Sequence, residues 1–228
     1  MIRLAVFASG EGTNLEALAL AIEAGTLQAR IACVVCDRPG AGVLGRACKH
    51  GLRSFVADPS AHPGREAHER AVVRAIEAEG GVDLAVLAGY MRIAGPVLRS
   101  APWPMINLHP SLLPSFPGRD AVAQALSAGV RVTGVTVHFV DAGVDTGPII
   151  AQEAVRVHEG DDEARLAARI HRAEHRLLPQ VVALVDEGRV RLENGRVRIL
   201  AARRAARTAD GHDTAARGSG RSRWQERS

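Results

Sequence analysis

An asparagine and a histidine stand two residues apart in the stretch INLHPSLLPSFPG, residues 106–118. In extended chain, the side chains of Asn107 and His109 therefore project to the same side. The Asn107 amide can donate a hydrogen bond to a developing oxyanion, and the His109 imidazole can move a proton near neutral pH. Three prolines follow, and they restrain the chain where it leaves the strand. The stretch predicts a catalytic pair held at a strand end by a stiff loop.

A catalytic histidine also needs a carboxylate that orients the ring and favours its charged form. We predict that Asp145 is this carboxylate, because it lies in the glycine-containing loop DAGVDTGP, residues 141–148. Asp141 is the competitor, although it is equally suited to cap a turn. His138 is expected to line the sheet near the site without carrying the reaction. A metal site built from His109, His138 and Asp145 is the alternative, but the short paired spacing of zinc motifs is missing, so we predict no metal.

A second candidate site lies near the N-terminus, where SGEGTN, residues 9–14, separates an apolar run from a helical pattern. Free amides and the helix dipole bind anions at such a helix start. A dinucleotide fingerprint would place a third glycine where this chain has Leu15, so the pattern favours a single phosphate. A tight turn with Thr13 or Asn14 as the helix cap explains the loop equally well.

Strand and helix patterns alternate along the chain. Strands are expected at residues 2–8, 30–36, 53–57, 82–88, 105–109, 130–140 and 148–157, with a hairpin of 189–193 and 196–199. Helices are expected at about residues 15–25, 42–51, 64–79, 95–100, 119–128 and 161–187. The repeated β–α–β order and the apolar strands predict an α/β fold, with a mostly parallel central sheet and helices on both faces. Ligands bind such sheets at the carboxyl ends of the strands.

Charge and composition narrow the classes of partner. The net charge is +4, but residues 201–228 hold seven of the 29 basic and three of the 25 acidic residues. Residues 1–200 therefore have no net charge, which disfavours a nucleic-acid partner. We expect residues 201–228, rich in Arg, Gly and Ser, to be a disordered basic tail, with loose binding to RNA as the alternative.

The remaining residues, 1–200, are expected to form one domain, with a phosphate-binding half at about 1–100 and a catalytic half at about 101–200. No run of 18 apolar residues is present, and the first residues, MIRLAVFASGEG, do not form a signal peptide. We therefore expect a cytoplasmic protein without a membrane partner. Cys33 and Cys36 lie in the apolar run RIACVVCDR, so we expect two buried, reduced thiols rather than a redox or zinc pair.

Taken together, SGEGTNL, LAGYMRI, INLHPSLLPSFPG, TGVTVHFVDAGVDTGPII and RIHRAEHRLLP resemble the phosphoribosylglycinamide formyltransferase family of purine biosynthesis. The resemblance runs from residue 1 to about residue 200, with the motifs in the family's order. It implies a Rossmann-like formyltransferase fold and a folate-binding role for the catalytic half. It further implies formyl transfer from 10-formyltetrahydrofolate, as co-substrate, to the amine of glycinamide ribonucleotide. A homodimer is left open.

The resemblance also implies a role for each matching residue. The catalytic trio is Asn107, His109 and Asp145, and the phosphoribosyl substrate is held by Gly12, Thr13, Asn14 and Glu174. Folate binding is implied for Arg65, Met91, Arg92, Ile93, Ala94, Phe139, Val140, Asp141, Ala142, Gly143 and Val144. One departure from the family pattern is Ser115, which stands where some relatives have lysine and removes a positive charge near the substrate.

Three other functions are compatible with parts of this sequence pattern. A formyltetrahydrofolate deformylase would use water as the acceptor, but that family carries an N-terminal regulatory domain, and here the first strand is expected from residue 2. A methionyl-tRNA formyltransferase carries a C-terminal RNA-binding domain and a strongly basic proline loop, whereas this chain has the neutral PSFPG. A phosphate-sensing module without activity would not require all three catalytic residues.

Overall fold

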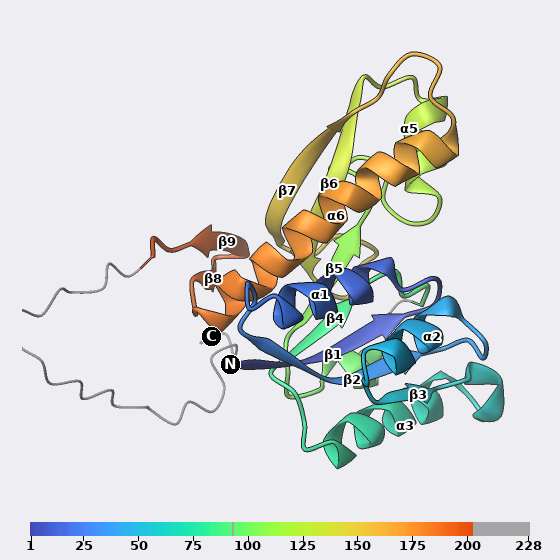
Figure 1. Ribbon diagram of the computed structural model, residues 1–228, viewed down its shortest axis with the longest axis vertical. Coiled ribbons are helices and arrows are strands. Elements are labelled where there is room, and N and C mark those ends of the chain that lie inside the picture. Colours follow the sequence, from blue (N-terminus) through green and yellow to red (C-terminus); the bar gives the residue numbers. More distant parts are fainter. Residues whose placement is uncertain (93, 203–228) are drawn as a thin grey trace, which may run out of the picture.

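The computed structural model describes residues 1–92 and 94–202, and in it seven strands form one sheet (Figure 1). The strands are β1 (Ile2–Ala8), β2 (Ala29–Cys36), β3 (Ser54–Val56), β4 (Leu84–Leu87), β5 (Met105–His109), β6 (Val132–Phe139) and β7 (Ile149–Arg156). Their order across the sheet is β3-β2-β1-β4-β5-β6-β7. All neighbours from β3 to β5 pair in parallel, whereas β6 runs antiparallel to both β5 and β7. The expected mostly parallel sheet is confirmed.

Helices connect these strands close to where the hydrophobic pattern predicts them. They are α1 (Thr13–Glu23), α2 (Gly42–Lys49), α3 (Arg65–Ala78), α4 (Pro96–Arg99), α5 (Ala121–Ser127) and α6 (Glu163–Asp186). A hairpin of β8 (Val190–Glu193) and β9 (Arg196–Ile199) follows α6, as its Asn-Gly turn predicts. A short 3-10 helix, η1 (Pro59–Ala61), was not expected; it begins where the Asp58 side chain accepts a hydrogen bond from the amide of Ser60.

The sheet has a hydrophobic core on each face, and alternation along the strands assigns residues to them. In β1, Leu4 and Val6 belong to the cluster that contains α1, α2 and α6 side chains, whereas Ala5 and Phe7 belong to the cluster on the α3 and α4 side. All four are fully buried. Because each buried large side chain contributes about 1.5–3 kcal/mol, these two layers hold the central strands in one register.

The two cysteines of β2 follow the same alternation. Cys33 lies in the α3-side core and Cys36 in the α1-side core, and both are free thiols. Burial raises the pKa of Cys33 to about 11, and it also raises the pKa of Cys36. The expected pair of buried, reduced thiols is confirmed.

Loops follow the carboxyl ends of the parallel strands, and two of these loops meet beside β1 and β4. The amide of Ser9 donates to the carbonyl of Gly89 at 3.0 Å, and the amide of Met91 donates to Ser9 Oγ at 2.8 Å. Strand order reverses at this place, because β2 follows β1 on one side and β4 lies on the other. Open α/β sheets bind their ligands in such a crevice.

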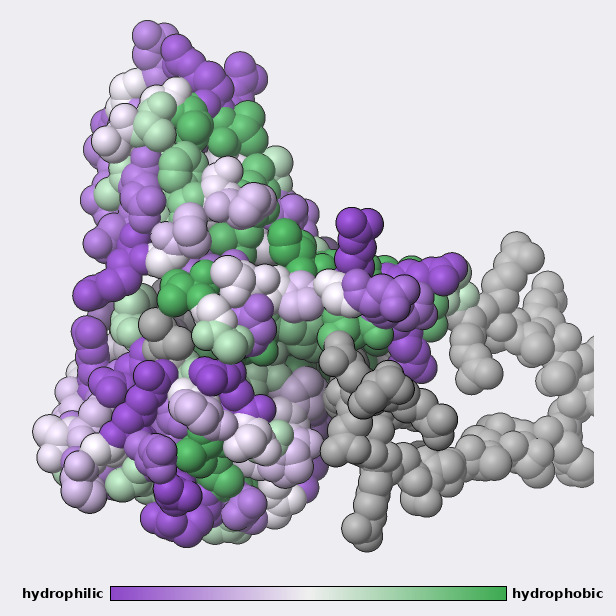
Figure 2. Space-filling model, turned by 180° about the vertical axis from the view of Figure 1, so that it is seen from behind, coloured by the Kyte–Doolittle hydropathy of each residue, from purple (hydrophilic) through white to green (hydrophobic). Residues whose placement is uncertain are grey.

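Apolar side chains reach the surface unevenly. Seen from behind, they gather over the upper part of the molecule, which contains β6, β7 and α5, whereas hydrophilic side chains dominate the lower part around α3 (Figures 1 and 2). Met91, Val132 and Val144 are among the exposed large apolar residues. Within residues 1–92 and 94–202, no helix is both long enough and apolar enough to cross a membrane. The predicted tail lies almost wholly in residues 203–228, outside the described residues.

Candidate active site

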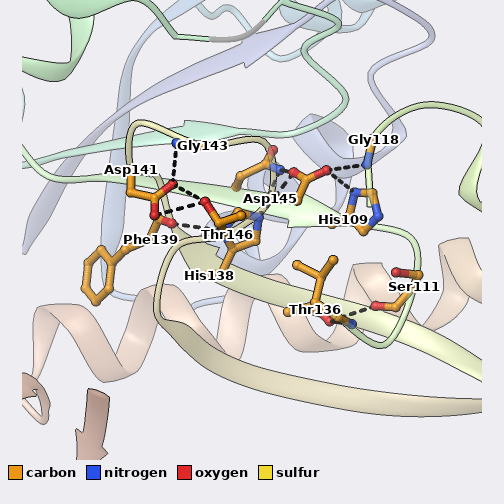
Figure 3. Close-up of polar contacts among 12 residues, drawn as sticks. His109, Ser111, Gly118, Thr136, His138, Phe139, Asp141, Gly143, Asp145 and Thr146 are labelled. Carbon is orange, nitrogen blue, oxygen red and sulfur yellow. Dashed lines mark hydrogen bonds and ion pairs between the residues drawn. The ribbon is translucent and has the colours of Figure 1, made fainter. Parts of the chain in front are cut away.

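The structure brings together the three side chains predicted to do chemistry (Figure 3). Asn107 Nδ2 donates to Asp145 Oδ1 at 3.1 Å, and His109 Nδ1 lies 3.3 Å from Asp145 Oδ2. Both Asn107 and His109 come from β5, two residues apart, and Asp145 comes from the loop between β6 and β7. Antiparallel pairing of β5 with β6 carries this loop back beside β5. The predicted Asn–His–Asp group therefore exists as one contiguous cluster.

His109 is buried and has an acceptor at each ring nitrogen. Its Nε2 donates to the carbonyl of Phe116 at 2.8 Å, and its Nδ1 faces the Asp145 carboxylate. Only a doubly protonated imidazole donates at both nitrogens. The residue is 4% exposed, so these two partners determine the orientation of the ring.

Asp145 lies between the imidazole rings of His109 and His138, and it also accepts from Asn107 Nδ2 and from the amide of Gly118. The amide of Gly118 donates to Oδ2 at 2.8 Å, and His138 Nε2 lies 3.5 Å from Oδ1. Burial by itself would raise the pKa of this carboxyl, but the contact with His138, the Gly118 amide and the charge of His109 outweigh it. The pKa of Asp145 is therefore held below its ordinary value, and the group is an anion at neutral pH.

Asp141, the competing carboxylate, has a different task. Its Oδ1 accepts from the amide of Gly143 at 3.0 Å, and both of its oxygens accept from Thr146 Oγ1, at 2.8 and 3.0 Å (Figure 3). The side chain thus folds its own loop in the manner of an Asx turn. This loop geometry places Asp145 against His109.

His138 contacts Asn107 and Asp145 directly, which we did not expect from the sequence. It lies opposite Asn107 in the β5–β6 pair, and its Nε2 is 3.2 Å from Asn107 Nδ2. Its Nδ1 donates to the carbonyl of Phe139 at 2.8 Å, so Nε2 is the ring nitrogen that faces Asn107 and Asp145. His138 therefore lines the site, as expected, and also contacts two members of the trio.

Sequence reasoning missed the side chains that hold the proline loop. Thr136, fully buried on β6, donates to the carbonyl of Ser111 at 2.7 Å and accepts from the amide of Leu113 at 3.0 Å. Gln152 on β7 donates to the carbonyl of Leu113 at 2.9 Å and to Thr136 Oγ1 at 3.0 Å. The signal available in the sequence was Thr136, a polar residue on the buried face of a strand. The loop is therefore fixed by β6 and β7 as well as by its prolines.

Ser115, the expected departure from the family pattern, is an exposed residue on this loop. Its carbonyl accepts from Ser111 Oγ at 2.5 Å, and its amide donates to the carbonyl of Leu112 at 3.0 Å. The backbone at this position is thus part of a tight turn, and the side chain is free to differ without changing it.

The glycine loop is packed directly against α2. Gly12 has φ 75°, and a Cβ at this position would lie 2.7 Å from Val43 Cα, so both conformation and space require glycine. Gly12 is the N-cap of α1, and no side-chain hydrogen bond caps this helix. The alternative of Thr13 or Asn14 as a capping side chain is therefore wrong.

The Asn14 side chain instead reaches α6. Its Nδ2 donates to Glu174 Oε2 at 2.9 Å, and both residues are buried. Within the described part of the chain, Asn14 Oδ1 has no hydrogen-bond partner although it is buried. A buried acceptor of this kind is costly unless a ligand donates to it. Asn14 and Glu174 therefore form a buried polar pair beside the glycine loop.

Glu174 is an unusual carboxylate, because burial raises its pKa, and the Asn14 hydrogen bond and the charges of His171 and His109 offset this only in part. Two histidines flank it on α6, His171 and His175, with stacked rings 6.4 Å apart. Burial, His171 and Arg46 lower the pKa of His175, which keeps its ring neutral. His109 acts electrostatically on Glu174, so the glycine-loop site and the catalytic trio are neighbours.

The residues with an implied folate role divide by exposure. Met91, Arg92 and Val144 are exposed, whereas Ala94 is buried in the α3-side core and Phe139 in the α1-side core. Val140 packs against the α3-side cluster, to which Ala94 also belongs. Ile93 lies outside the described residues. Any ligand here would meet the exposed side chains and the backbone of the two buried residues.

The metal alternative required His109, His138 and Asp145 as ligands. Across residues 1–92 and 94–202, no group of three or more His, Cys, Asp or Glu side chains is arranged to hold a metal ion. His109, His138 and Asp145 lie close together, but they form ion-pair contacts with one another instead.

Comparison with known proteins shows the family to which this chain belongs. Residues 2–182 match the formyl transferase family. Phosphoribosylglycinamide formyltransferase of Bacillus subtilis (strain 168) is 45% identical over 183 residues, which cover 80% of this chain and 93% of that protein. The trifunctional purine biosynthetic protein adenosine-3 of Bos taurus is 44% identical over 197 residues, 86% of this chain but 19% of that longer protein.

Solved structures show the same likeness. Glycinamide ribonucleotide transformylase 1 from Symbiobacterium toebii has a TM-score of 0.85 and 48% identity, covering 88% of this chain and 95% of that chain. Phosphoribosylglycinamide formyltransferase from Bacillus halodurans has a TM-score of 0.76 and 45% identity, covering 80% and 94%. The chain therefore belongs to the formyl transferase family, and its resemblance to phosphoribosylglycinamide formyltransferase is confirmed.

Proposed function

We propose that this protein transfers the formyl group of 10-formyltetrahydrofolate to the amine of glycinamide ribonucleotide. The products are formylglycinamide ribonucleotide and tetrahydrofolate, in de novo purine biosynthesis. The observation that carries the proposal is the Asn107–His109–Asp145 cluster in a chain of this family. Its location at the carboxyl edge of the sheet is where such folds bind ligands.

The chemistry follows from the cluster. The amine nitrogen attacks the formyl carbon, and the carbonyl electron pair moves onto oxygen to give a tetrahedral intermediate. The Asn107 amide and the protonated His109 ring donate to this oxyanion. Collapse of the intermediate breaks the bond to N10 of the folate, and the proton lost by the amine is delivered to N10 through water organised by Asp145.

The described structure shows these donors engaged within the protein. Asn107 Nδ2 contacts both Asp145 and His138, and His109 Nε2 is bound to the carbonyl of Phe116. The formyl oxygen must therefore replace one of these acceptors when it binds. Exchange of one acceptor for another loses little energy, because each donor keeps a partner throughout.

Two regions suit the two substrates. We assign the phosphoribosyl end of glycinamide ribonucleotide to the glycine loop, Gly12, Thr13 and Asn14, together with Glu174. Asn14 Oδ1 is a buried acceptor without a donor among the described residues, and a substrate hydroxyl could donate to it. For the co-substrate, Met91 and Val144 are exposed apolar residues that a flat folate ring would cover. We assign Arg65, Arg92 and the backbone of residues 139–144 to the same co-substrate, and no metal takes part in this scheme.

Replacing Glu174 by glutamine is expected to weaken substrate binding while stabilising the protein. Folding raises the pKa of Glu174, so the wild type loses stability as the pH rises from the ordinary glutamate pKa through the raised folded value. Glutamine removes this loss and keeps the acceptor for Asn14. We expect the KM for glycinamide ribonucleotide to rise about tenfold, and Tm at pH 8 to rise by about 2–4 °C, the shift that ~1 kcal/mol produces in a chain of this size.

Steady-state kinetics and thermal unfolding at pH 5 and pH 8 measure both effects. Glu163→Gln, an exposed position at the start of the same helix, is the matched control and should change neither. A Glu174→Gln protein with wild-type KM, or with the same Tm difference from wild type at both pH values, contradicts the assignment.

The proposed reaction itself is tested with both substrates present. Tetrahydrofolate and formylglycinamide ribonucleotide should appear in equal amounts, and omission of the ribonucleotide should abolish folate release. Folate released equally fast without the ribonucleotide would establish the deformylase alternative, in which water is the acceptor. Release that requires a different amine would point to another folate-dependent formyltransferase.

Other parts of the proposal concern the setting of the enzyme. We infer a cytoplasmic protein whose partners are its two small-molecule substrates, without a membrane or nucleic-acid partner. A homodimer is compatible with the fold, and light scattering of the purified chain at several concentrations distinguishes it from a monomer.

A further inference from the structure

A buried carboxylate outside the catalytic trio has no part in the mechanism above. Glu69, on α3, is 2% exposed, yet it accepts hydrogen bonds from three backbone amides around the start of α4. Oε1 accepts from Gly95 at 2.6 Å, and Oε2 accepts from Val97 at 3.1 Å and Leu98 at 3.3 Å. The first amides of a helix have no partner within the helix, so Glu69 supplies one from a neighbouring element.

The same carboxylate holds a cation. Arg65, one turn earlier on α3, places its Nε 3.2 Å from Glu69 Oε1, and its side chain is half exposed. Gly95 closes the arrangement, because a Cβ at this position would overlap Glu69 Oε1 and would lie 2.6 Å from Arg65 Nε. A buried charge is costly unless it is fully paired, and here three amides and a guanidinium surround it. The pairing ties Arg65 to the backbone at Gly95.

This junction lies directly after the segment that contains Met91, Arg92 and Ala94, which we assign to the proposed folate site. The amide of Met91 is anchored to Ser9 Oγ at the start of that segment, and Arg99 NH1 donates to the carbonyl of Ala94 at 2.6 Å at its end. Glu69 fixes the next residue, Gly95. The segment is therefore held at both ends, and its exposed side chains, Met91 and Arg92, lie between the two anchors.

We propose that Glu69 is the positioning residue of the formyl-folate site, because it fixes the backbone next to Ala94 and holds the Arg65 guanidinium with one buried carboxylate. This inference rests on the proposed function, since it assumes that both groups face the folate. Glu69 touches neither substrate and acts through the groups it holds. Its loss should therefore affect the folate more than the ribonucleotide, whose proposed site is the glycine loop with Glu174.

Glu69→Gln tests this assignment, because it keeps the shape of the side chain but turns an amide donor toward backbone amides and Arg65. We expect the Kd for tetrahydrofolate, measured by calorimetry, and the KM for 10-formyltetrahydrofolate to rise about tenfold. The KM for glycinamide ribonucleotide should change less than about twofold, within the spread of surface substitutions. Glu66→Gln is the matched control, since Glu66 lies on α3, is exposed and pairs with Arg70.

Gly95→Ala provides a second route that retains both charges and displaces the carboxylate by steric overlap. It should raise the same two folate constants, and amide hydrogen exchange should accelerate in residues 91–98 in both variants. Faster exchange without a change in either folate constant would show that Glu69 is a helix cap only, and an equal rise in both KM values would show a general loss of structure. Either result overturns the assignment.

Tetrahydrofolate binding by the wild type distinguishes a failure of the proposed function from a failure of the role assigned to Glu69. Wild-type protein that fails to bind tetrahydrofolate refutes the proposed function. Wild-type protein that binds it, with Glu69→Gln and Gly95→Ala binding equally well, refutes only the role of Glu69.

Discussion

Replacing His109 by alanine is expected to lower kcat for formyl transfer by about a thousandfold, with smaller changes in the two KM values. The ring is the charged donor to the oxyanion, and a positioned acid of this kind contributes about 10²–10⁴-fold to a rate. It contacts Asp145 and the carbonyl of Phe116, so its removal also frees the carboxylate from its cationic partner. Steady-state kinetics with both substrates at saturation measures the effect.

The control for this substitution is His158→Ala, at an exposed position after β7. It should leave kcat unchanged, and thermal unfolding of both variants should show that His109→Ala is folded. A folded His109→Ala protein that retains more than about a tenth of the wild-type rate would exclude the proposed acid and oxyanion role.

Asp145→Asn is expected to have the second large effect, a loss of about 10²–10³-fold in kcat. Asparagine has the same shape, but it removes the negative charge that lies 3.3 Å from His109 Nδ1 and 3.5 Å from His138 Nε2. The amide of Gly118 also loses a charged acceptor at 2.8 Å. The His109 ring would lose its anionic partner, and the relay water would lose its base.

The pH dependence of folding gives an independent check of the same charge. Because the folded protein lowers the pKa of Asp145, its contribution to stability is present above the unfolded pKa and is lost as the pH falls through the lower folded value. Asp145→Asn should therefore flatten the acid side of the stability profile. Equal acid slopes for wild type and variant, measured by urea unfolding, would contradict the geometry of the site.

Asp141→Asn separates the two carboxylates that the sequence left in competition. Asp141 uses both oxygens on Gly143 and Thr146 of its own loop, so its substitution should loosen that loop and raise the KM for the folate. The loss in kcat should be much smaller than for Asp145→Asn. A reversed order of the two kcat values would transfer the proton-relay role to Asp141.

Much of the fold could be predicted from the sequence, because strands and helices leave local periodic signals. Apolar runs marked the seven strands of the sheet, and the Asn-Gly pair marked the final hairpin. The boundaries differ by a few residues, as in β4, which spans Leu84–Leu87 where residues 82–88 were expected. The short helix at Pro59–Ala61 gave no periodic signal, since its three residues are fewer than one turn of an α-helix.

The pairing of Asn107 with His109 could also be predicted, because they are neighbours in the chain and strand geometry places them on one side. Asp145 was predicted as the carboxylate over Asp141, but its contact with His109 depends on how its loop folds over β5. Only the antiparallel pairing of β6 with β5 brings that loop back to His109. The contact of His138 with Asn107 depends on the same pairing.

The sequence by itself thus determined the order of the elements and the chemistry available at each strand end, since both depend on residues close together in the chain. Only the tertiary structure decided which distant groups meet. Asn14 donates to Glu174 across 160 positions, and Glu69 binds the amide of Gly95 across 26. Local patterns carry no record of such contacts, because a buried polar group is satisfied by whichever donor the packing of the sheet and helices brings within hydrogen-bond distance.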